Sequence, residues 1–190
     1  MSLVMSAEVQ LDKYILTDIS YIEGSVKDID NVKLANFCFT EGVRYDEDST
    51  GSRYEDFKIP SCDEWDKILE NIQYQYFKVY KTTLHLSEHW AHIHKKYEST
   101  NIHHHVNIDC MSKDPDISGV YYVQVPENSG KLVFEYNINQ YQTKRFWVEP
   151  IVGNFFLFPS TLNHFVTKNM GDDLRISISF NLKSEQHDIN

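Results

Sequence analysis

The chain has 190 residues, enough for one domain with a substantial buried core. Its formal net charge of −10 argues against general nucleic-acid binding, because phosphate contacts need clustered Lys and Arg. The three widely spaced cysteines form no Cys-x-x-Cys pair, which argues against a disulfide framework and indicates a reducing compartment. With neither a signal-peptide pattern nor an apolar run of membrane-spanning length, we expect a cytoplasmic protein with no membrane partner.

In the first part of the chain, helices and irregular segments are expected. Lys27–Thr40 has a loose helical period, and the acidic Tyr45–Phe57 is predicted to be an exposed loop. The strongest helix signal covers Ser61–Tyr76, where acidic residues follow a Pro-Ser start and apolar residues recur at helical spacing. We therefore predict a single domain over residues 1–190, in which residues 1–80 form a helical or irregular support.

Beyond residue 80 the hydrophobic period changes to two, which is typical of strands. The candidate strands are Lys81–His94, Ile102–Ile108, Ile117–Val125, Lys131–Tyr136, Arg145–Val148, Asn154–Phe158, His164–Lys168 and Leu174–Leu182. Turns rich in Pro, Gly, Asn and Asp separate several of them. This series predicts a mainly β core over residues 81–183, either a jelly roll or a small barrel, with the helix packed against one sheet.

Three histidines form the clearest candidate metal site. His103 and His105 are two apart on a predicted strand, so their side chains should point to the same face, and His164 comes from a distant strand. Neutral imidazole is the commonest metal ligand in proteins. Ferrous iron in oxygenases is usually held by two histidines and one carboxylate, so Asp109 stays open as an alternative to His105.

The closing strand Leu174–Leu182 alternates between polar and apolar residues, and two interpretations of it stay open. Its polar face could meet solvent, as in an ordinary half-buried strand. Alternatively, that face lines a pocket in which Arg175 holds a carboxylate with two parallel hydrogen bonds and Ser177 adds another. A metal with a fixed cation nearby is the layout of a non-haem iron site that binds a keto acid.

Together, these segments resemble the 2-oxoglutarate- and Fe(II)-dependent oxygenase superfamily, and within it a branch common in bacteria and tailed phages. Besides His-x-His, the resemblance is carried by ISGVYYVQVPENSGKLVF (Ile117–Phe134), FFLFPSTLNHFVTKN (Phe155–Asn169) and LRISISFN (Leu174–Asn181). Trp90 stands where this family often has a Trp ahead of the first metal ligand. The His-x-Asp pair of the wider superfamily is missing, which leaves open a site of three histidines.

The resemblance implies a double-stranded β-helix, a cupin-like jelly roll with supporting N-terminal helices and iron at its mouth. It assigns His103, His105 and His164 to Fe(II), and to 2-oxoglutarate it assigns Arg175, Ser177 and Tyr122, with Tyr121 as the less favoured choice. The implied activity is a dioxygenase that hydroxylates a small-molecule or peptide substrate and releases succinate and CO2. A phage-encoded protein would act in the host cytoplasm.

Two other functions stay open. One is a non-enzymatic jelly-roll module that binds a ligand or partner, and the other is a cupin-type metalloenzyme with three histidines and no keto acid. Arg175 favours the oxygenase, since a cupin without a keto acid needs no arginine at that spacing. His92 and His94 continue the alternating pattern and are expected to line the pocket or lie on the surface. The substrate and the oligomeric state stay open.

Overall fold

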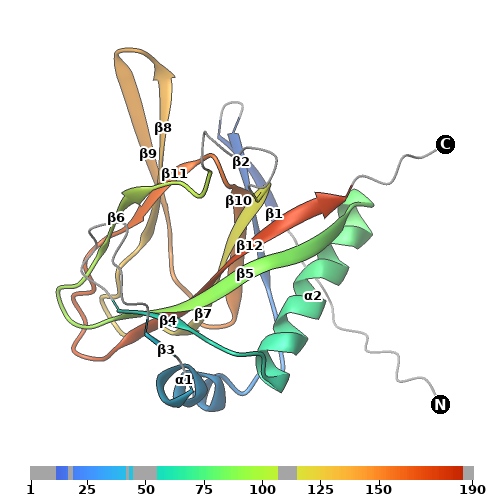
Figure 1. Cartoon of the computed structure of the whole chain (residues 1–190). Coiled ribbons are helices and arrows are strands. Elements are labelled where there is room, and N and C mark those ends of the chain that lie inside the picture. Colours follow the sequence, from blue (N-terminus) through green and yellow to red (C-terminus); the bar gives the residue numbers. More distant parts are fainter. Residues whose placement is uncertain (1–11, 17–18, 42, 45–54, 107–114, 186–190) are drawn as a thin grey trace.

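A computed structural model describes residues 12–16, 19–41, 43–44, 55–106 and 115–185. The helices in these ranges are α1 (Asn31–Thr40) and α2 (Asp63–Tyr80), and the strands are β1 (Asp12–Leu16), β2 (Ile19–Ser25), β3 (Val43–Arg44), β4 (Glu55–Lys58), β5 (Thr83–His94), β6 (Thr100–His103), β7 (Ile117–Gln124), β8 (Leu132–Asn139), β9 (Gln142–Val148), β10 (Asn154–Pro159), β11 (Asn163–Val166) and β12 (Arg175–Glu185). They build a larger antiparallel sheet, β1-β2-β10-β7-β12-β5-β4-β3, and a smaller one, β6-β11-β8-β9 (Figure 1). The mainly β jelly roll with N-terminal helices is therefore confirmed.

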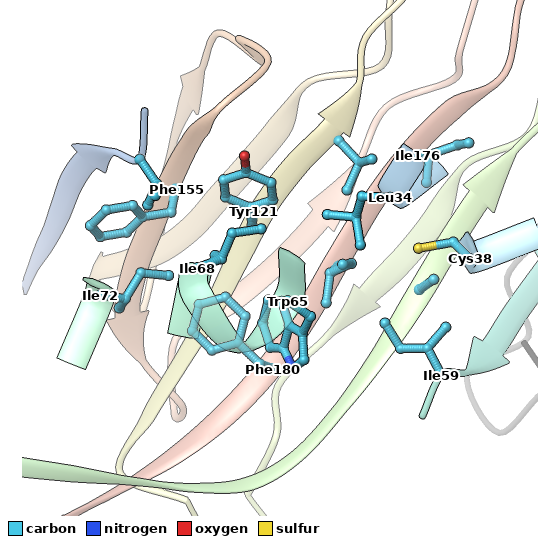
Figure 2. Packing of buried hydrophobic residues seen from close by; sticks show 14 of the residues in the cluster. Leu34, Cys38, Ile59, Trp65, Ile68, Ile72, Tyr121, Phe155, Ile176 and Phe180 are labelled. Atoms are coloured by element: carbon cyan, nitrogen blue, oxygen red, sulfur yellow. The ribbon is translucent and has the colours of Figure 1, made fainter. Parts of the chain in front are cut away.

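The larger sheet is covered on both faces, which explains why most residues of its central strands β10, β7 and β12 are buried. On the outer face, Trp65 of α2 packs against Phe180 of β12, with ring centroids 5.5 Å apart (Figure 2). On the inner face, a second cluster that includes Tyr122 and Phe156 contacts Phe134 of the smaller sheet. A strand buried on both sides loses the simple alternation of apolar and polar residues, and β7 is accordingly buried from Ser118 to Val123.

Helix α2 confirms the strongest helix prediction, but its first and last residues differ from the predicted ones. It begins at Asp63 rather than Ser61, and it continues to Tyr80 because neither Pro nor Gly interrupts it. Lys81 then adopts a left-handed conformation, with φ 56°, and its backbone N–H donates to the Phe77 carbonyl at 2.9 Å. Neither helix in the described ranges combines the length and apolar character needed to span a bilayer.

The N-terminal part also contributes strands that were not predicted. β1 pairs with β2, and β2 pairs with β10, where Gly24 lies opposite Phe155. β4 pairs with β5, although Glu55–Phe57 was assigned to the acidic loop; residues 45–54 of that loop lie outside the described ranges. These strands have two to seven residues, too few for a period of two to stand out from chance.

Most predicted strands of the core are confirmed, and β6 is the exception. It covers Thr100–His103 instead of Ile102–Ile108, so His105 lies beyond the end of the strand. The backbone N–H of His105 donates to the Ser160 carbonyl at 2.9 Å rather than joining a regular ladder. The expectation that His103 and His105 share a face of one strand is therefore wrong, and a turn positions the second histidine.

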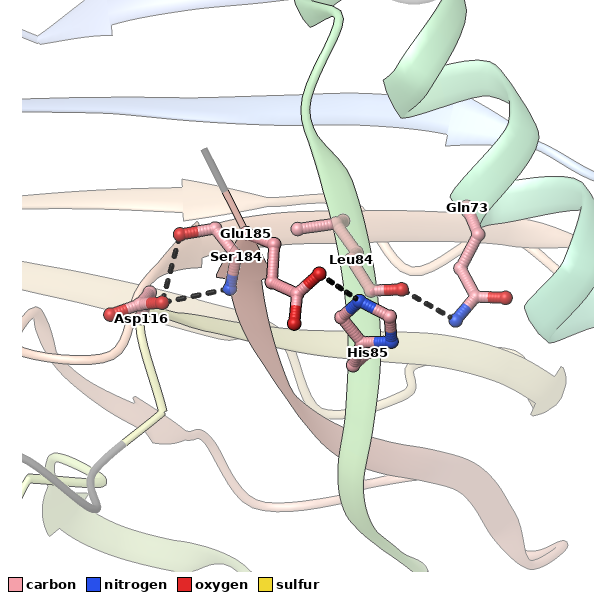
Figure 3. A network of polar contacts seen from close by, with 6 residues as sticks. All are labelled: Gln73, Leu84, His85, Asp116, Ser184 and Glu185. Carbon is pink, nitrogen blue, oxygen red and sulfur yellow. Dashed lines mark hydrogen bonds and ion pairs between the residues drawn. The ribbon is translucent and has the colours of Figure 1, made fainter. Parts of the chain in front are cut away.

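Hydrogen bonds connect the C-terminal end of β12 to neighbouring segments (Figure 3). Asp116, which precedes β7, accepts hydrogen bonds from the backbone N–H and hydroxyl of Ser184, both at 2.8 Å. Gln73 of α2 donates to the Leu84 carbonyl of β5 at 2.9 Å. These bonds tie β12 and β5 into the sheet and the helix layer, and β12 carries Arg175 at its opposite end.

Candidate metal and keto-acid site

The three predicted histidines come together where β6, β11 and the segment after β6 meet. His103 and His164 are directly opposite each other in the β6–β11 pair, with ring centroids 4.3 Å apart. The His105 ring lies 5.1 Å from that of His103 and 5.0 Å from that of His164. Potential ligand nitrogens of all three lie within 4.8 Å of one another, which is compatible with one shared metal ion.

Each of these imidazoles uses Nδ1 to contact an oxygen that accepts hydrogen bonds but cannot donate them. The contacts join His103 to the Asn101 carbonyl (2.8 Å), His105 to Asn181 Oδ1 (2.6 Å) and His164 to the Leu162 carbonyl (2.8 Å). Nδ1 must therefore carry the proton in each ring, which leaves the lone pair on Nε2. In metal-binding histidines, a hydrogen bond of this kind from the nitrogen that does not bind the metal fixes the tautomer and the orientation of the ring.

Electrostatics also favour the neutral form of two of these rings, those of His105 and His164. Burial, followed by the neighbouring His103 and His105, holds the pKa of His164 well below its ordinary value. Burial lowers the pKa of His105 to about 4, although its hydrogen bond with Asn181 opposes the shift. Because only the unprotonated ring can bind a metal, both side chains are ready to do so at neutral pH.

Arg175 lies at the other end of the same pocket and is 1% exposed. Its Nε donates to the Gly130 carbonyl at 3.1 Å, and its Nη1 donates to the Ser177 hydroxyl at 2.9 Å. Nη1 also lies 3.4 Å from Nδ1 of His94, and the guanidinium carbon is 5.2 Å from the ring centre of Tyr122. These contacts hold the guanidinium in one orientation.

Within the described ranges, no carboxylate forms an ion pair with Arg175. A buried cation without an anionic partner is costly, and burial accordingly lowers the pKa of Arg175. Beside it lies the buried Tyr122 hydroxyl; burial raises its pKa, and the neighbouring Arg175 opposes that shift. The Arg175 guanidinium and the Tyr122 hydroxyl are both hydrogen-bond donors, so together they suit a carboxylate ligand.

The pocket between the two ends has about 410 Å³ of space free of atoms, its opening to solvent included. Its walls include the three histidines, Arg175, Ser177 and His92. The alternation of β12 is therefore resolved in favour of a pocket-lining polar face, because Arg175 and Ser177 are both buried there. His94 lies behind Arg175 rather than on the surface, and its other ring nitrogen contacts Thr100 at 2.9 Å.

The two tyrosines of β7 point to opposite sides of the sheet. Tyr122 lies on the inner side with Arg175, whereas Tyr121 is on the helix side, where its hydroxyl donates to Asn31 of α1 at 3.0 Å. Trp90 lies beside the histidines, with its ring centre 5.6 Å from that of His105. Asp109, the alternative ligand, lies outside the described residues.

Sequence reasoning missed the residues that support these side chains. Asn181 was placed on the polar face of its strand without a role, and neither Gly130 nor Glu88 was singled out. The Gly130 carbonyl holds Arg175, and Glu88 accepts a hydrogen bond from Asn181 at 2.7 Å. The alternation of β5, which continues from His94 back to Glu88, is the signal that could have identified the latter.

The jelly roll, with a cluster of three imidazoles and a buried arginine in one pocket, is a cupin-like fold with a candidate metal site. Residues 88–181, about half of the chain, match the family model described as "Putative 2OG-Fe(II) oxygenase". Residues 88–181 therefore form a domain of the 2-oxoglutarate- and Fe(II)-dependent oxygenase family, whose cofactors are Fe(II) and 2-oxoglutarate. Comparison with curated protein sequences gives no match.

Several solved structures share the fold at low sequence identity. A prolyl-4-hydroxylase from Pseudomonas putida is 15% identical, with a TM-score of 0.60 and coverage of 87% of this chain and 93% of that one. The viral collagen prolyl hydroxylase of Paramecium Bursaria Chlorella virus-1, solved with 2-oxoglutarate, is 14% identical, with a TM-score of 0.62 and coverage of 85% and 94%. The epimerase SnoN from nogalamycin biosynthesis, solved with Fe3+ and α-ketoglutarate, is 13% identical, with a TM-score of 0.59 and coverage of 86% and 78%.

Proposed function

We propose that this protein is a dioxygenase that hydroxylates its substrate while converting 2-oxoglutarate and O2 to succinate and CO2. One oxygen atom enters the substrate C–H bond, and the other enters succinate. The observation that carries the proposal is the buried Arg175, which has no carboxylate partner within the described ranges and shares a pocket with three clustered imidazoles. A dicarboxylate that also binds a metal can reach the metal at the histidine end of this pocket and pair with Arg175 at the other end.

In this proposal, His103, His105 and His164 hold Fe(II) through Nε2. Arg175 and Ser177 hold the distal carboxylate of 2-oxoglutarate, and the Tyr122 hydroxyl donates to the same group. Bound Fe(II) and 2-oxoglutarate supply the oxidative chemistry, while the protein orients them and excludes water. The donor set fits the metal because the Nδ1 contacts put the lone pairs on Nε2.

The substrate is proposed to be a small molecule or a peptide. Similar folds serve both kinds of chemistry: one is described as a collagen prolyl hydroxylase and another as an epimerase in nogalamycin biosynthesis. We also retain the expectation of a cytoplasmic protein, with a host cytoplasm as its location if the gene belongs to a phage.

Succinate release tests the function directly. Wild-type protein incubated with Fe(II), O2 and 2-oxoglutarate is expected to form succinate slowly even without substrate, and His164→Ala is expected to form none. Arg175→Ala should need about 10- to 150-fold more 2-oxoglutarate, as follows from losing one charged hydrogen bond worth ~1.5–3 kcal/mol. Arg145→Ala is the matched control, because this arginine is exposed and pairs with Glu135. Succinate formation at equal rates in wild type and His164→Ala would contradict the proposal.

A further inference from the structure

His105 differs from the other two histidines in the way it is held. His103 and His164 contact backbone carbonyls, whereas the acceptor for His105 is the side chain of Asn181 on β12. Asn181 is 2% exposed, although its neighbour across the β5–β12 pair, Glu88, lies at the surface. The orientation of the second histidine therefore depends on a side chain distant in the sequence.

The orientation of the Asn181 amide follows from its partners. Glu88 is a carboxylate that only accepts, so the amide nitrogen of Asn181 must face it, and the two atoms are 2.7 Å apart. The amide oxygen then faces His105, at 2.6 Å from Nδ1. An oxygen in this place requires the proton on Nδ1, so the tautomer of His105 is determined, through Asn181, by Glu88.

Two serines support the same oxygen of Asn181 from the other side. Ser118 of β7 donates its only hydroxyl proton to Asn181 Oδ1 at 2.8 Å. The contact between the hydroxyls of Ser118 and Ser160, at 2.9 Å, must therefore have Ser160 as its donor. The Ser160 carbonyl in turn accepts from the backbone N–H of His105 at 2.9 Å. Ring and backbone of His105 are thus both connected to one buried network.

We propose that Asn181 and Glu88 are positioning residues for His105, forming a carboxylate–amide–imidazole relay that keeps Nε2 unprotonated and aimed at the metal. This inference rests on the proposed function for the identity of the ligand, but the tautomer itself can be measured without metal. The relay would bring the influence of a carboxylate to this site, because no carboxylate among the described residues belongs to the histidine cluster itself. In the carboxylate–histidine–metal arrangement, a carboxylate that accepts a hydrogen bond from the imidazole makes the ring more basic. Here Glu88 would act on His105 in the same way, through the amide of Asn181.

An exchange of the two functional groups provides the sharpest test. In Asn181→Asp combined with Glu88→Gln, the amide at position 88 can donate to the carboxylate at position 181, which still accepts from His105. In Asn181→Leu, which has a similar volume, the acceptor is lost. The control is Asn154→Leu, because Asn154 on β10 also donates to a glutamate, Glu23, at 3.2 Å, and its side chain makes no hydrogen bond with any of the three histidines.

Two readouts separate positioning from folding. Nitrogen NMR of the metal-free protein reports which nitrogen of the His105 ring is protonated, and anaerobic competition with a chelator gives the Fe(II) dissociation constant. We expect wild type, Asn154→Leu and the exchanged double variant to carry the proton on Nδ1 and to bind Fe(II) with similar affinity. Asn181→Leu should lose this single tautomer and bind Fe(II) about 10- to 100-fold more weakly.

The outcomes distinguish this inference from the proposed function. If the Nδ1 tautomer persists in Asn181→Leu and its Fe(II) affinity equals that of wild type, the relay is wrong while the oxygenase assignment stands. If wild type binds no Fe(II), the proposed function fails, and the NMR comparison alone decides whether the relay exists. A double variant that is folded but behaves like Asn181→Leu would also overturn the relay.

Discussion

Metal-free protein should lose stability in mild acid because of His94, which is buried beside a guanidinium. Arg175 can only donate, so Nδ1 of His94 accepts, and Nε2 therefore donates to Thr100. Both ring nitrogens are thus used in the neutral state. Burial, followed by the positive charge of Arg175, holds the pKa of His94 well below its ordinary value.

The sign and the size of the effect follow from linkage. In the unfolded chain His94 takes up a proton near pH 6.5, whereas in the folded chain it stays neutral, so acid stabilises the unfolded state. The contribution to stability is complete above pH 6.5 and is lost as the pH falls toward the depressed pKa of the folded state. Between pH 7.5 and 5.5, this single histidine should lower the free energy of unfolding by about 1.4 kcal/mol.

Urea unfolding with a chelator at pH 7.5, 6.5 and 5.5 measures this loss. His94→Gln keeps a donor and an acceptor but does not titrate, so it should remove about 1.4 kcal/mol of the difference between pH 7.5 and 5.5. His85→Gln, an exposed histidine on the same strand, controls for the change of residue type. Identical pH dependence in wild type and His94→Gln would show that protonation of His94 does not destabilise the folded state.

Four further variants test the fold and the site. Trp65→Ala removes a fully buried ring from the helix layer and should cost about 3–5 kcal/mol of unfolding free energy in urea, while a loss below about 1 kcal/mol would contradict the packing. Gly130→Ala adds a methyl group that would overlap the Thr167 carbonyl oxygen, so calorimetry should give lower stability and titration weaker 2-oxoglutarate binding than in wild type. His105→Ala should lose Fe(II) while Asp109→Asn retains it, and the opposite result would assign the second ligand to the aspartate.

Much of the fold could be predicted because several elements carry a clear pattern in the sequence. Polar and apolar residues alternate along β12, and α2 has acidic residues in its first turn and apolar residues on one face. The strands of the N-terminal part were missed because they are short and because some of their partners, such as β10 for β2, are far away in the sequence. Pairing of this kind arises from tertiary contacts, which propensity and short-range alternation do not encode.

The sequence predicted which residues form the site better than it predicted how they are arranged. The structure brings His103, His105 and His164 together, but β6 ends before His105, so the turn and the bond to Ser160 could not be inferred from a period of two. The choice of Tyr122 over Tyr121 agrees with the side of β7 on which each side chain lies, and a binding role for Tyr122 stays a prediction. The role of Asn181 was not predicted because it depends on hydrogen bonds with His105, Ser118 and Glu88, which come from three other segments.

The shared Fe(II) and 2-oxoglutarate site can be tested by anaerobic titration of the purified protein with Fe(II) and then 2-oxoglutarate, followed by visible absorption. We expect a weak charge-transfer band that saturates at one iron and one keto acid per chain. We also expect Arg175→Ala to bind the iron but to need more 2-oxoglutarate to form the band. Wild-type protein that binds iron yet gives no band at any 2-oxoglutarate concentration would contradict the shared site, and would point to a three-histidine metalloenzyme without a keto acid.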